Sequence, residues 1–218
     1  MFIINCKNYE EIAGDKVVKL AKIIEKISKK YKIKIALVPP HHLLTKITDL
    51  SIPVLAQHVD NTRVGSTTGF IIPELLKTSK ITGSLINHSE HRISSNDIKQ
   101  LVSRLQKLKM LSIVCVKNIA EVKKYAKLNP DYIAIEPPEL IGSGKAISKE
   151  KPELITKAVT AVKNVNNSTK LLCGAGIVTG DDVEKAIQLG AKGILVASGI
   201  IKSKNWEKII VEFSKAMI

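Results

Sequence analysis

Residues 98–116 read IKQLVSRLQKLKMLSIVCV and join the two kinds of element from which the chain is built. The first half carries an i, i+3, i+4 stripe of apolar side chains, which predicts a helix with one buried face: Ile98, Leu101, Val102, Leu105 and Leu108. The second half, LSIVCV, is a nearly continuous apolar run, which is typical of a parallel strand covered on both faces. The stretch therefore predicts a helix followed by a buried strand.

The same alternation runs through the whole chain. Short runs rich in β-branched and other apolar residues predict eight strands, at residues 2–5, 33–38, 53–56, 83–87, 111–116, 132–136, 170–173 and 193–197. The segments between them have helical periodicity, and three helices have a start signal with an acidic residue three positions later: Ser94, Asn118 and Thr179. Residues 43–50 and 73–79 leave room for short helices only.

Eight strand–helix units point to a closed (β/α)₈ barrel, because a doubly wound sheet usually has five or six parallel strands. No break in composition and no linker rich in Pro, Gly or Ser divides the units, so we expect a single domain over residues 1–218. The length of 218 residues is compact for a barrel whose typical size is about 250 residues. We therefore expect short connections on both sides of the third strand.

The charge of the chain is strongly basic, with 34 Lys and Arg against 20 Asp and Glu, a formal net charge of +14. A basic nucleic-acid-binding protein is one interpretation. The lysines are spread along nearly the whole chain without a basic tail, and aromatic residues make up only 4%. We therefore favour a solvated lysine coat and expect no nucleic-acid partner.

Other features of the composition bear on location and metals. No apolar stretch reaches the ~18–20 residues that span a bilayer, and the N-terminus lacks the pattern of a signal peptide, so we expect a cytoplasmic protein without membrane contact. The three cysteines, Cys6, Cys115 and Cys173, form no C-x-x-C pair and lack ligand spacing with the histidines. They predict reduced structural thiols and no metal site.

Polar and glycine-rich segments follow five of the predicted strands: Asn5-Cys6-Lys7, Asn87-His88-Ser89-Glu90, Glu136-Pro137, Cys173-Gly174-Ala175-Gly176 and Ala197-Ser198-Gly199. In a (β/α)₈ barrel these strand ends build the active site. A buried carboxylate is a competent base, an imidazole polarises a carbonyl, and loops rich in small residues expose N–H groups to phosphate. The set fits proton abstraction beside a carbonyl in a phosphorylated substrate.

Two alternatives stay open on these residues alone. Glu136 could form a structural ion pair with Lys7 or Arg92 instead of acting as a base. The glycine-rich loops also fit another phosphate-binding barrel enzyme, such as a phosphosugar isomerase or synthase. Such an enzyme does not require Lys7, His88 and Glu136 together, so the presence of all three residues argues against this alternative.

At these positions the chain resembles the triosephosphate isomerase family, and more narrowly its compact archaeal form. The shared elements follow one another in order over the whole chain: Asn5-x-Lys7, His88-Ser89-Glu90-x-Arg92, Glu136-Pro137 with Ile141-Gly142-Ser143-Gly144, Cys173-Gly174-Ala175-Gly176 and Ala197-Ser198-Gly199. The resemblance implies a TIM barrel and reversible interconversion of D-glyceraldehyde 3-phosphate and dihydroxyacetone phosphate through an enediolate, in glycolysis and gluconeogenesis. It implies no metal or organic cofactor.

The resemblance also implies residue roles. Glu136 would shuttle the proton and His88 would act as the neutral electrophile, a division of roles known for this family. Lys7 would supply positive potential, Asn5 would orient Lys7 and the substrate, and Glu90 would support both Lys7 and His88. Substrate phosphate would be bound by Ile141, Gly142, Gly176, Ala197 and Ser198. Residues 137–144 would form a mobile lid that excludes water, as is known for the family. The compact form implies a homo-oligomer, a tetramer in preference to a dimer.

Three positions depart from the pattern common in bacterial and eukaryotic members of that family. His91 replaces an arginine after His88-Ser89-Glu90, and Glu139 stands where the lid usually carries tryptophan. Cys173-Gly174-Ala175-Gly176 replaces a Y-G-G-S loop. We therefore expect the anchoring of the lid and the side-chain contacts to phosphate to differ in this chain.

Overall fold

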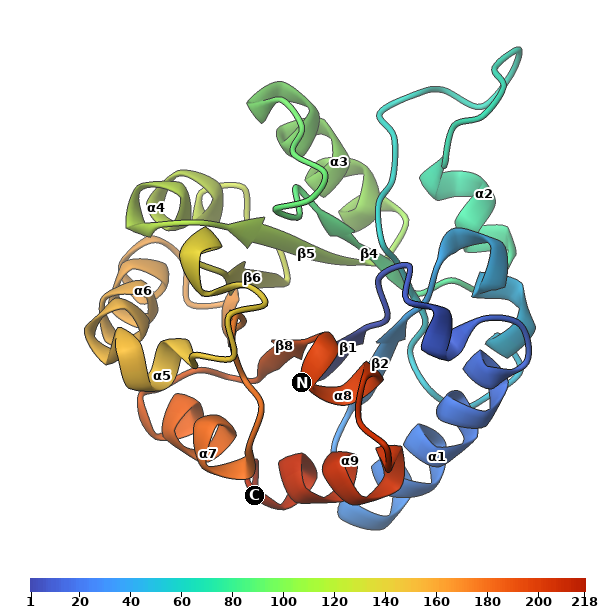
Figure 1. The fold of residues 1–218 in the computed structure, drawn as a ribbon. Coiled ribbons are helices and arrows are strands. Elements are labelled where there is room, and N and C mark those ends of the chain that lie inside the picture. Colours follow the sequence, from blue (N-terminus) through green and yellow to red (C-terminus); the bar gives the residue numbers. More distant parts are fainter.

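The computed structural model describes residues 1–218, with eight parallel strands surrounded by helices (Figure 1). The strands are β1 (Phe2–Asn5), β2 (Ile35–Val38), β3 (Leu55–Ala56), β4 (Gly83–Ile86), β5 (Leu111–Val116), β6 (Tyr132–Ile135), β7 (Lys170–Cys173) and β8 (Ile194–Val196). The helices are α1 (Lys16–Tyr31), α2 (Pro73–Thr78), α3 (Ser95–Lys107), α4 (Ile119–Ala126), α5 (Ile147–Glu150), α6 (Pro152–Val165), α7 (Gly180–Gln188), α8 (Ser198–Ile201) and α9 (Trp206–Lys215). Three 3₁₀ helices add η1 (Glu10–Ile12), η2 (His41–Ile47) and η3 (Pro138–Leu140).

The strands pair in the order β2-β1-β8-β7-β6-β5-β4-β3. The remaining gap, between β2 and β3, is closed by a single parallel bridge from Leu37 to Val54, where the amide of Leu37 donates to the carbonyl of Pro53 at 3.0 Å. The fold is the TIM barrel that the sequence predicts. β3 is shorter than predicted because only Leu55 and Ala56 pair in a ladder with β4.

Two apolar layers account for the continuous apolar runs in the strands. Alternate strand residues point to opposite faces, so in β5 Ile113 and Cys115 belong to a cluster of 10 residues, while Val114 and Val116 belong to a cluster of 51. The small cluster fills the inside of the barrel, and the large one packs the strands against the helices. The three cysteines are buried and free, which confirms their prediction as structural thiols.

The predicted helix starts are confirmed by their cap geometry. The side chains of Ser94, Asn118 and Thr179 each accept a hydrogen bond from the backbone N–H three residues later. Thr179 and Asp182 form a complete capping box at the start of α7. This cap fixes where the chain turns from the loop after β7 into the helix, and that loop belongs to the rim of the barrel.

The connections beside β3 are only partly as predicted. Their helical pieces, η2 and α2, are short as expected. The segment between β3 and α2, residues 57–72, is instead long and projects from the barrel (Figure 1). Asp60 closes its base, because its N–H donates to the carbonyl of Ile71 at 2.8 Å and its carboxylate accepts from the N–H of Ile71 at 2.7 Å. These hydrogen bonds pair backbone groups at the two ends of the loop without a helix. The helical periodicity of the sequence could not predict them.

None of the helices combines the length and the apolar character needed to cross a membrane. The helices instead have one apolar face each. In α1 the buried residues are those of its predicted stripe: Val17, Leu20, Ala21, Ile24 and Ile27. The opposite face of α1 carries the lysines expected for a solvated coat.

Thr179→Ala should lower the free energy of unfolding by about 1 kcal/mol, because it removes the side-chain acceptor of the α7 cap. Urea unfolding followed by circular dichroism measures the change. Thr160→Ala is the matched control, since the Thr160 hydroxyl is also exposed but only bonds the carbonyl of Thr156 within α6. Equal unfolding free energies for both variants would contradict the role of the cap.

Candidate active site

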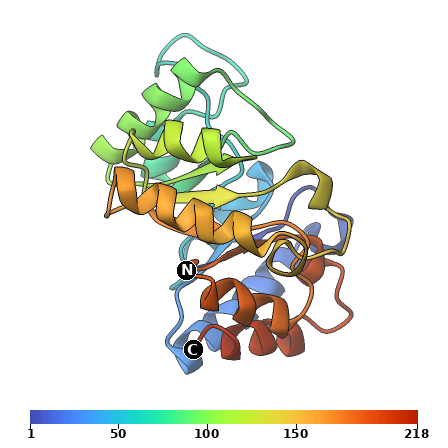
Figure 2. The same cartoon turned by 90° about the vertical axis from the view of Figure 1, so that its left-hand side faces the viewer.

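The carboxyl ends of the strands meet at one rim of the barrel, on the side of the molecule away from the N-terminus (Figure 2). A cavity of about 150 Å³ opens there. Its lining includes nine residues predicted from the sequence: Asn5, Lys7, His88, Glu136, Ile141, Gly142, Gly176, Ala197 and Ser198. The tenth predicted residue, Glu90, lines a larger neighbouring cavity. The barrel therefore brings together residues that are up to 193 positions apart in the sequence.

Glu136 is the most unusual group of the cavity. It follows β6 directly, is only 7% exposed, and its Oε2 atom has no hydrogen-bond partner. Burial raises the pKa of the Glu136 carboxyl above its ordinary value, and the nearby positive charge of Lys7 acts in the opposite direction. A carboxylate with a free oxygen and a raised pKa is suited to accept a proton.

Gly174 makes room for this carboxylate. It follows β7, and a Cβ atom at this position would lie 2.5 Å from Cγ of Glu136. Any side chain at position 174 would therefore displace Glu136. Gly174 does not have a positive φ, so its backbone conformation does not require glycine. The close approach of the Glu136 side chain does.

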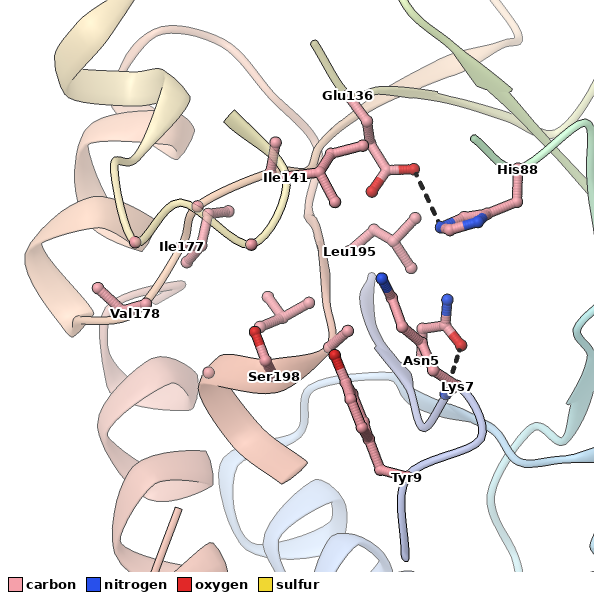
Figure 3. Close-up of a pocket in the computed structure, with 17 residues that line it drawn as sticks. Asn5, Lys7, Tyr9, His88, Glu136, Ile141, Ile177, Val178, Leu195 and Ser198 are labelled. Atoms are coloured by element: carbon pink, nitrogen blue, oxygen red, sulfur yellow. Dashed lines mark hydrogen bonds and ion pairs between the residues drawn. The ribbon is translucent and has the colours of Figure 1, made fainter. Parts of the chain in front are cut away.

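His88 lies opposite Glu136, with 3.7 Å between its Nε2 and Oε2 of Glu136 (Figure 3). The backbone N–H of Glu90 donates to Nδ1 of His88 at 3.2 Å. A ring nitrogen that accepts a hydrogen bond carries no proton, so this contact selects the tautomer with the proton on Nε2. The neutral imidazole thus presents an N–H donor to the cavity.

The turn after β1 positions the ammonium group of Lys7. Lys7 has a φ of 46°, and its backbone N–H donates to Oδ1 of Asn5 at 3.0 Å. The side chain of Gln57 holds the other end of the same residue by donating to the carbonyl of Lys7 at 2.8 Å. These two hydrogen bonds stabilise a left-handed backbone that a lysine rarely adopts.

The ion pairs at the rim bear on the structural alternative for Glu136, a pair with Lys7 or Arg92. Lys7 pairs with Glu90 at 2.7 Å, and Arg92 pairs with Glu121 at 3.3 Å. Neither cation forms an ion pair with Glu136, so the structural alternative for this residue is not found. Glu90 also lies 3.7 Å from Nδ1 of His88, which places it beside both predicted neighbours.

The end of the cavity away from Glu136 and His88 is lined by residues of the loops after β6, β7 and β8. Gly142 comes from the segment after β6, Gly176 from the loop after β7, and Ala197 and Ser198 from the start of α8. Ala175 and Gly176 both have positive φ, 69° and 71°. Both residues are therefore in the left-handed region of backbone conformation, in the loop directly after β7.

The segment at residues 137–144 lies over the cavity and contributes Ile141, Gly142 and Gly144 to its wall. Its two glycines have positive φ, 71° and 72°. Glu139 forms an ion pair with Lys151, which fixes the segment to the loop before α6. Position 139, where the family pattern led us to expect a difference, thus carries an ion pair.

Sequence reasoning missed several residues that line the cavity, among them Tyr9, Ile177 and Leu195, and it missed Gln57 in the neighbouring cavity. Tyr9 follows Lys7 by two positions in a polar segment that gave no signal of its own. Gln57 acts through a contact with Lys7 across 50 positions, and only the closed barrel creates it. Leu195 belongs to the inner apolar cluster and forms the floor of the site.

A TIM barrel with a buried carboxylate, a neutral imidazole and an ammonium group around one small cavity defines an acid–base enzyme for a small polar substrate. Comparison with known proteins gives the family. The triosephosphate isomerase family model matches residues 1–213. The triosephosphate isomerase of Cenarchaeum symbiosum is 53% identical over 217 residues, covering 100% of this chain and 97% of the relative. The enzyme of Methanocaldococcus jannaschii is 46% identical and covers 99% of both chains.

The chain therefore belongs to the triosephosphate isomerase family and is an enzyme of that activity. A further full-length relative, the triosephosphate isomerase of Methanothermus fervidus, is 44% identical over 218 residues. All three relatives are archaeal, in agreement with the resemblance to the compact archaeal form. The family assignment decides against the other phosphate-binding barrel enzymes that the glycine-rich loops alone would fit.

Gly174→Ala should lower kcat/KM by about 100-fold, because the new methyl group pushes the Glu136 carboxylate away from its position and a shift of about 1 Å is enough for such a loss. A coupled assay of isomerisation measures the change, and circular dichroism checks that the barrel is intact. Gly180→Ala is the control, since a Cβ there meets the flexible side chain of Glu212 at 3.1 Å. Activity of Gly174→Ala equal to that of the control would overturn the positioning argument.

Proposed function

We propose that Glu136 is the base of the isomerisation between D-glyceraldehyde 3-phosphate and dihydroxyacetone phosphate. The observation that carries this assignment is the buried carboxylate with a free Oε2, which lies 3.7 Å from the His88 imidazole. The carboxylate takes a proton from the hydroxyl-bearing carbon beside the carbonyl and returns it to the former carbonyl carbon, while the hydroxyl proton passes to the former carbonyl oxygen. Exclusion from water raises the basicity of this group, so that proton abstraction requires less free energy.

His88 acts as the electrophile in this proposal. Its Nε2–H donates to the carbonyl oxygen of the substrate and stabilises the negative charge that develops on the enediolate. Because Nδ1 already accepts from the N–H of Glu90, the ring is held in the required tautomer before the substrate binds. A neutral donor also avoids placing a second positive charge beside Lys7.

Lys7 supplies the positive potential. Its ammonium group balances the charge of the enediolate and of the phosphate, while Asn5 fixes the turn that presents it. Glu90 positions Lys7 through their 2.7 Å ion pair, and it remains 59% exposed, which fits a supporting role better than proton transfer. The catalytic residues are thus Glu136, His88 and Lys7, with Asn5 in substrate binding.

The substrate phosphate binds at the opposite end of the cavity. We assign its contacts to backbone N–H groups at five positions: Ile141, Gly142, Gly176, Ala197 and Ser198. Residues 137–144 act as the lid over the enediolate, a role known for the family. Exclusion of water by this lid protects the intermediate from losing phosphate.

Glu136→Gln should lower kcat by about 10²- to 10⁴-fold with little change in KM, since the amide fills the same space but cannot accept the proton. The coupled isomerase assay measures both constants. Retention of near-full kcat would show that another group is the base.

The same variant should be more stable than the wild type at about pH 8. The raised pKa means that the folded protein binds this proton more tightly than the unfolded chain, whose carboxyl has the ordinary value of 4.5. Ionisation of Glu136 therefore destabilises the folded state above the raised pKa. Urea midpoints should converge below about pH 4, where the carboxyl is protonated in both states. A midpoint for Glu136→Gln below that of the wild type at pH 8 would contradict the burial argument.

Deletion of residues 140–143 should increase the fraction of substrate converted to methylglyoxal and inorganic phosphate, because the enediolate then meets water. Quantification of methylglyoxal against isomerised product measures this fraction. An unchanged fraction at reduced activity would show that the segment binds the substrate without protecting the intermediate.

We further propose a homo-oligomer, a tetramer in preference to a dimer, by analogy with the compact archaeal form. Apolar side chains exposed on the projecting segment 57–72 support an association through this loop: Val64 is 55% and Phe70 is 50% exposed. Exposed apolar groups on a protruding loop are typical of protein contact sites.

Val64→Ser combined with Phe70→Ser should therefore shift the mass found by sedimentation velocity to a smaller species. Val165→Ser is the control, because Val165 is also exposed but ends α6. A wild type that sediments as a monomer would overturn the oligomer proposal. A double variant that keeps the wild-type mass would locate the contact elsewhere.

We also propose that residues 1–218 fold as one domain in the cytoplasm. Support for one domain comes from the cluster of 51 buried residues, which includes Phe2 and Phe213 at the two ends of the chain. Support for a reducing compartment comes from the three free, buried cysteines.

A further inference from the structure

Tyr9 stands between two cavities at the rim. It lines the substrate cavity of about 150 Å³ and also the neighbouring cavity of about 760 Å³, which includes Gln57 and Glu90. Its ring extends from the turn after β1 toward the start of α8, with the hydroxyl oxygen at the end of the ring that faces α8 (Figure 3). Tyr9 is thus a side wall of the cavity at the end away from Glu136 and His88.

The hydroxyl of Tyr9 is free to bind a ligand. It forms no hydrogen bond with the rest of the chain, in contrast to the hydroxyl of Tyr125, which lies 3.2 Å from Oγ of Ser95. A phenol hydroxyl offers one donor and accepts as well. An acceptor-only group in the cavity, such as a phosphate dianion, would be a suitable partner for this donor.

Lys202 contacts the ring of Tyr9. Its Nζ lies 4.9 Å from the centroid of the Tyr9 ring, within the range of a cation–π contact. Lys202 caps the carboxyl end of α8, whose first residues line the cavity. The contact ties the ring to α8, and the charge above the ring draws electron density away from the hydroxyl and strengthens it as a donor.

The geometry of the reacting end decides which part of the substrate Tyr9 would meet. Nε2 of His88 and Oε2 of Glu136 lie side by side, 3.7 Å apart, so a carbonyl oxygen that accepts from Nε2–H places the neighbouring carbon beside the carboxylate. A triose phosphate is a short chain, and its phosphate then extends toward Gly176, Ser198 and Tyr9. Most donors at that end are backbone N–H groups, and the side-chain hydroxyls are those of Ser198 and Tyr9.

We propose that Tyr9 is a substrate-positioning residue whose hydroxyl donates a hydrogen bond to the phosphate of the triose phosphate, with Lys202 fixing its ring. The proposal rests on the assignment of Glu136 and His88 to the reacting carbons. It adds a side-chain donor to a phosphate site otherwise built from backbone. It also gives one surface lysine, Lys202, a role at the active site.

The test compares Tyr9→Phe with Tyr31→Phe. Both variants keep an aromatic ring under a lysine, since Nζ of Lys30 lies 5.5 Å from the Tyr31 ring, but Tyr31 is on α1 and outside the cavity. Loss of a hydrogen bond to a charged group predicts a KM for D-glyceraldehyde 3-phosphate about tenfold higher in Tyr9→Phe. We expect kcat to stay within about twofold, because the bond is equal in the ground and transition states.

Calorimetric titration with inorganic phosphate gives a readout that does not depend on catalysis. Its dissociation constant should rise by a similar factor in Tyr9→Phe and should not change in Tyr31→Phe. Lys202→Gln should raise KM by about two- to fivefold, in line with an exposed cation–π contact. It should have a smaller effect in the Tyr9→Phe background, where the donor is already absent.

Unchanged KM and unchanged phosphate binding in Tyr9→Phe would overturn the proposal. A fall in kcat with unchanged KM would also overturn it, because the hydroxyl would then act at the reacting end. These outcomes do not depend on whether Glu136 is the base. If Glu136→Gln kept full activity while Tyr9→Phe lost phosphate affinity, the phosphate contact would stand and the base would be another residue.

Discussion

The site depends on one unfavourable arrangement, a carboxylate withdrawn from water at the rim of the barrel. Glu136 is 7% exposed and leaves Oε2 without a hydrogen bond. Such a group costs free energy in the folded state, because ionisation is disfavoured by burial. The rest of the rim maintains it: Gly174 leaves room for the side chain, and Glu90 and Glu121 engage the cations that would otherwise neutralise it.

The (β/α)₈ barrel tolerates the free-energy cost of burying Glu136 because its stabilising apolar packing lies in other parts of the fold. The clusters of 10 and 51 buried residues lie inside the barrel and between the strands and helices, away from the rim. The rim can therefore hold strained and unpaired groups, such as the left-handed Lys7 and Ala175. Substrate binding can then use groups that the fold does not need for its own stability.

Much of this could be predicted from the sequence, since apolar runs covered on both faces identify parallel strands and the residues after each run belong to one rim. Asn5, His88, Glu136 and the loops at Gly176 and Ser198 follow from this rule. The contacts of Gln57 with Lys7 and of Lys202 with the Tyr9 ring do not follow from it, because they join residues far apart in the sequence and only the closed barrel creates them. The prediction of a short connection at 57–72 is wrong. Hydrogen bonds between Asp60 and Ile71 stabilise a long loop there, and these contacts leave no periodic pattern in the sequence.

The most direct test of the account is the ionisation of Glu136 in the protein without substrate. Carbon-13 NMR of protein labelled at glutamate side-chain carboxyls, with Glu136→Gln used to assign the signal, follows this group through a pH titration. The account predicts a pKa above the ordinary value of 4.5. A pKa at or below that value would mean that the carboxylate is solvated or paired in solution, and it would contradict the central role of burial.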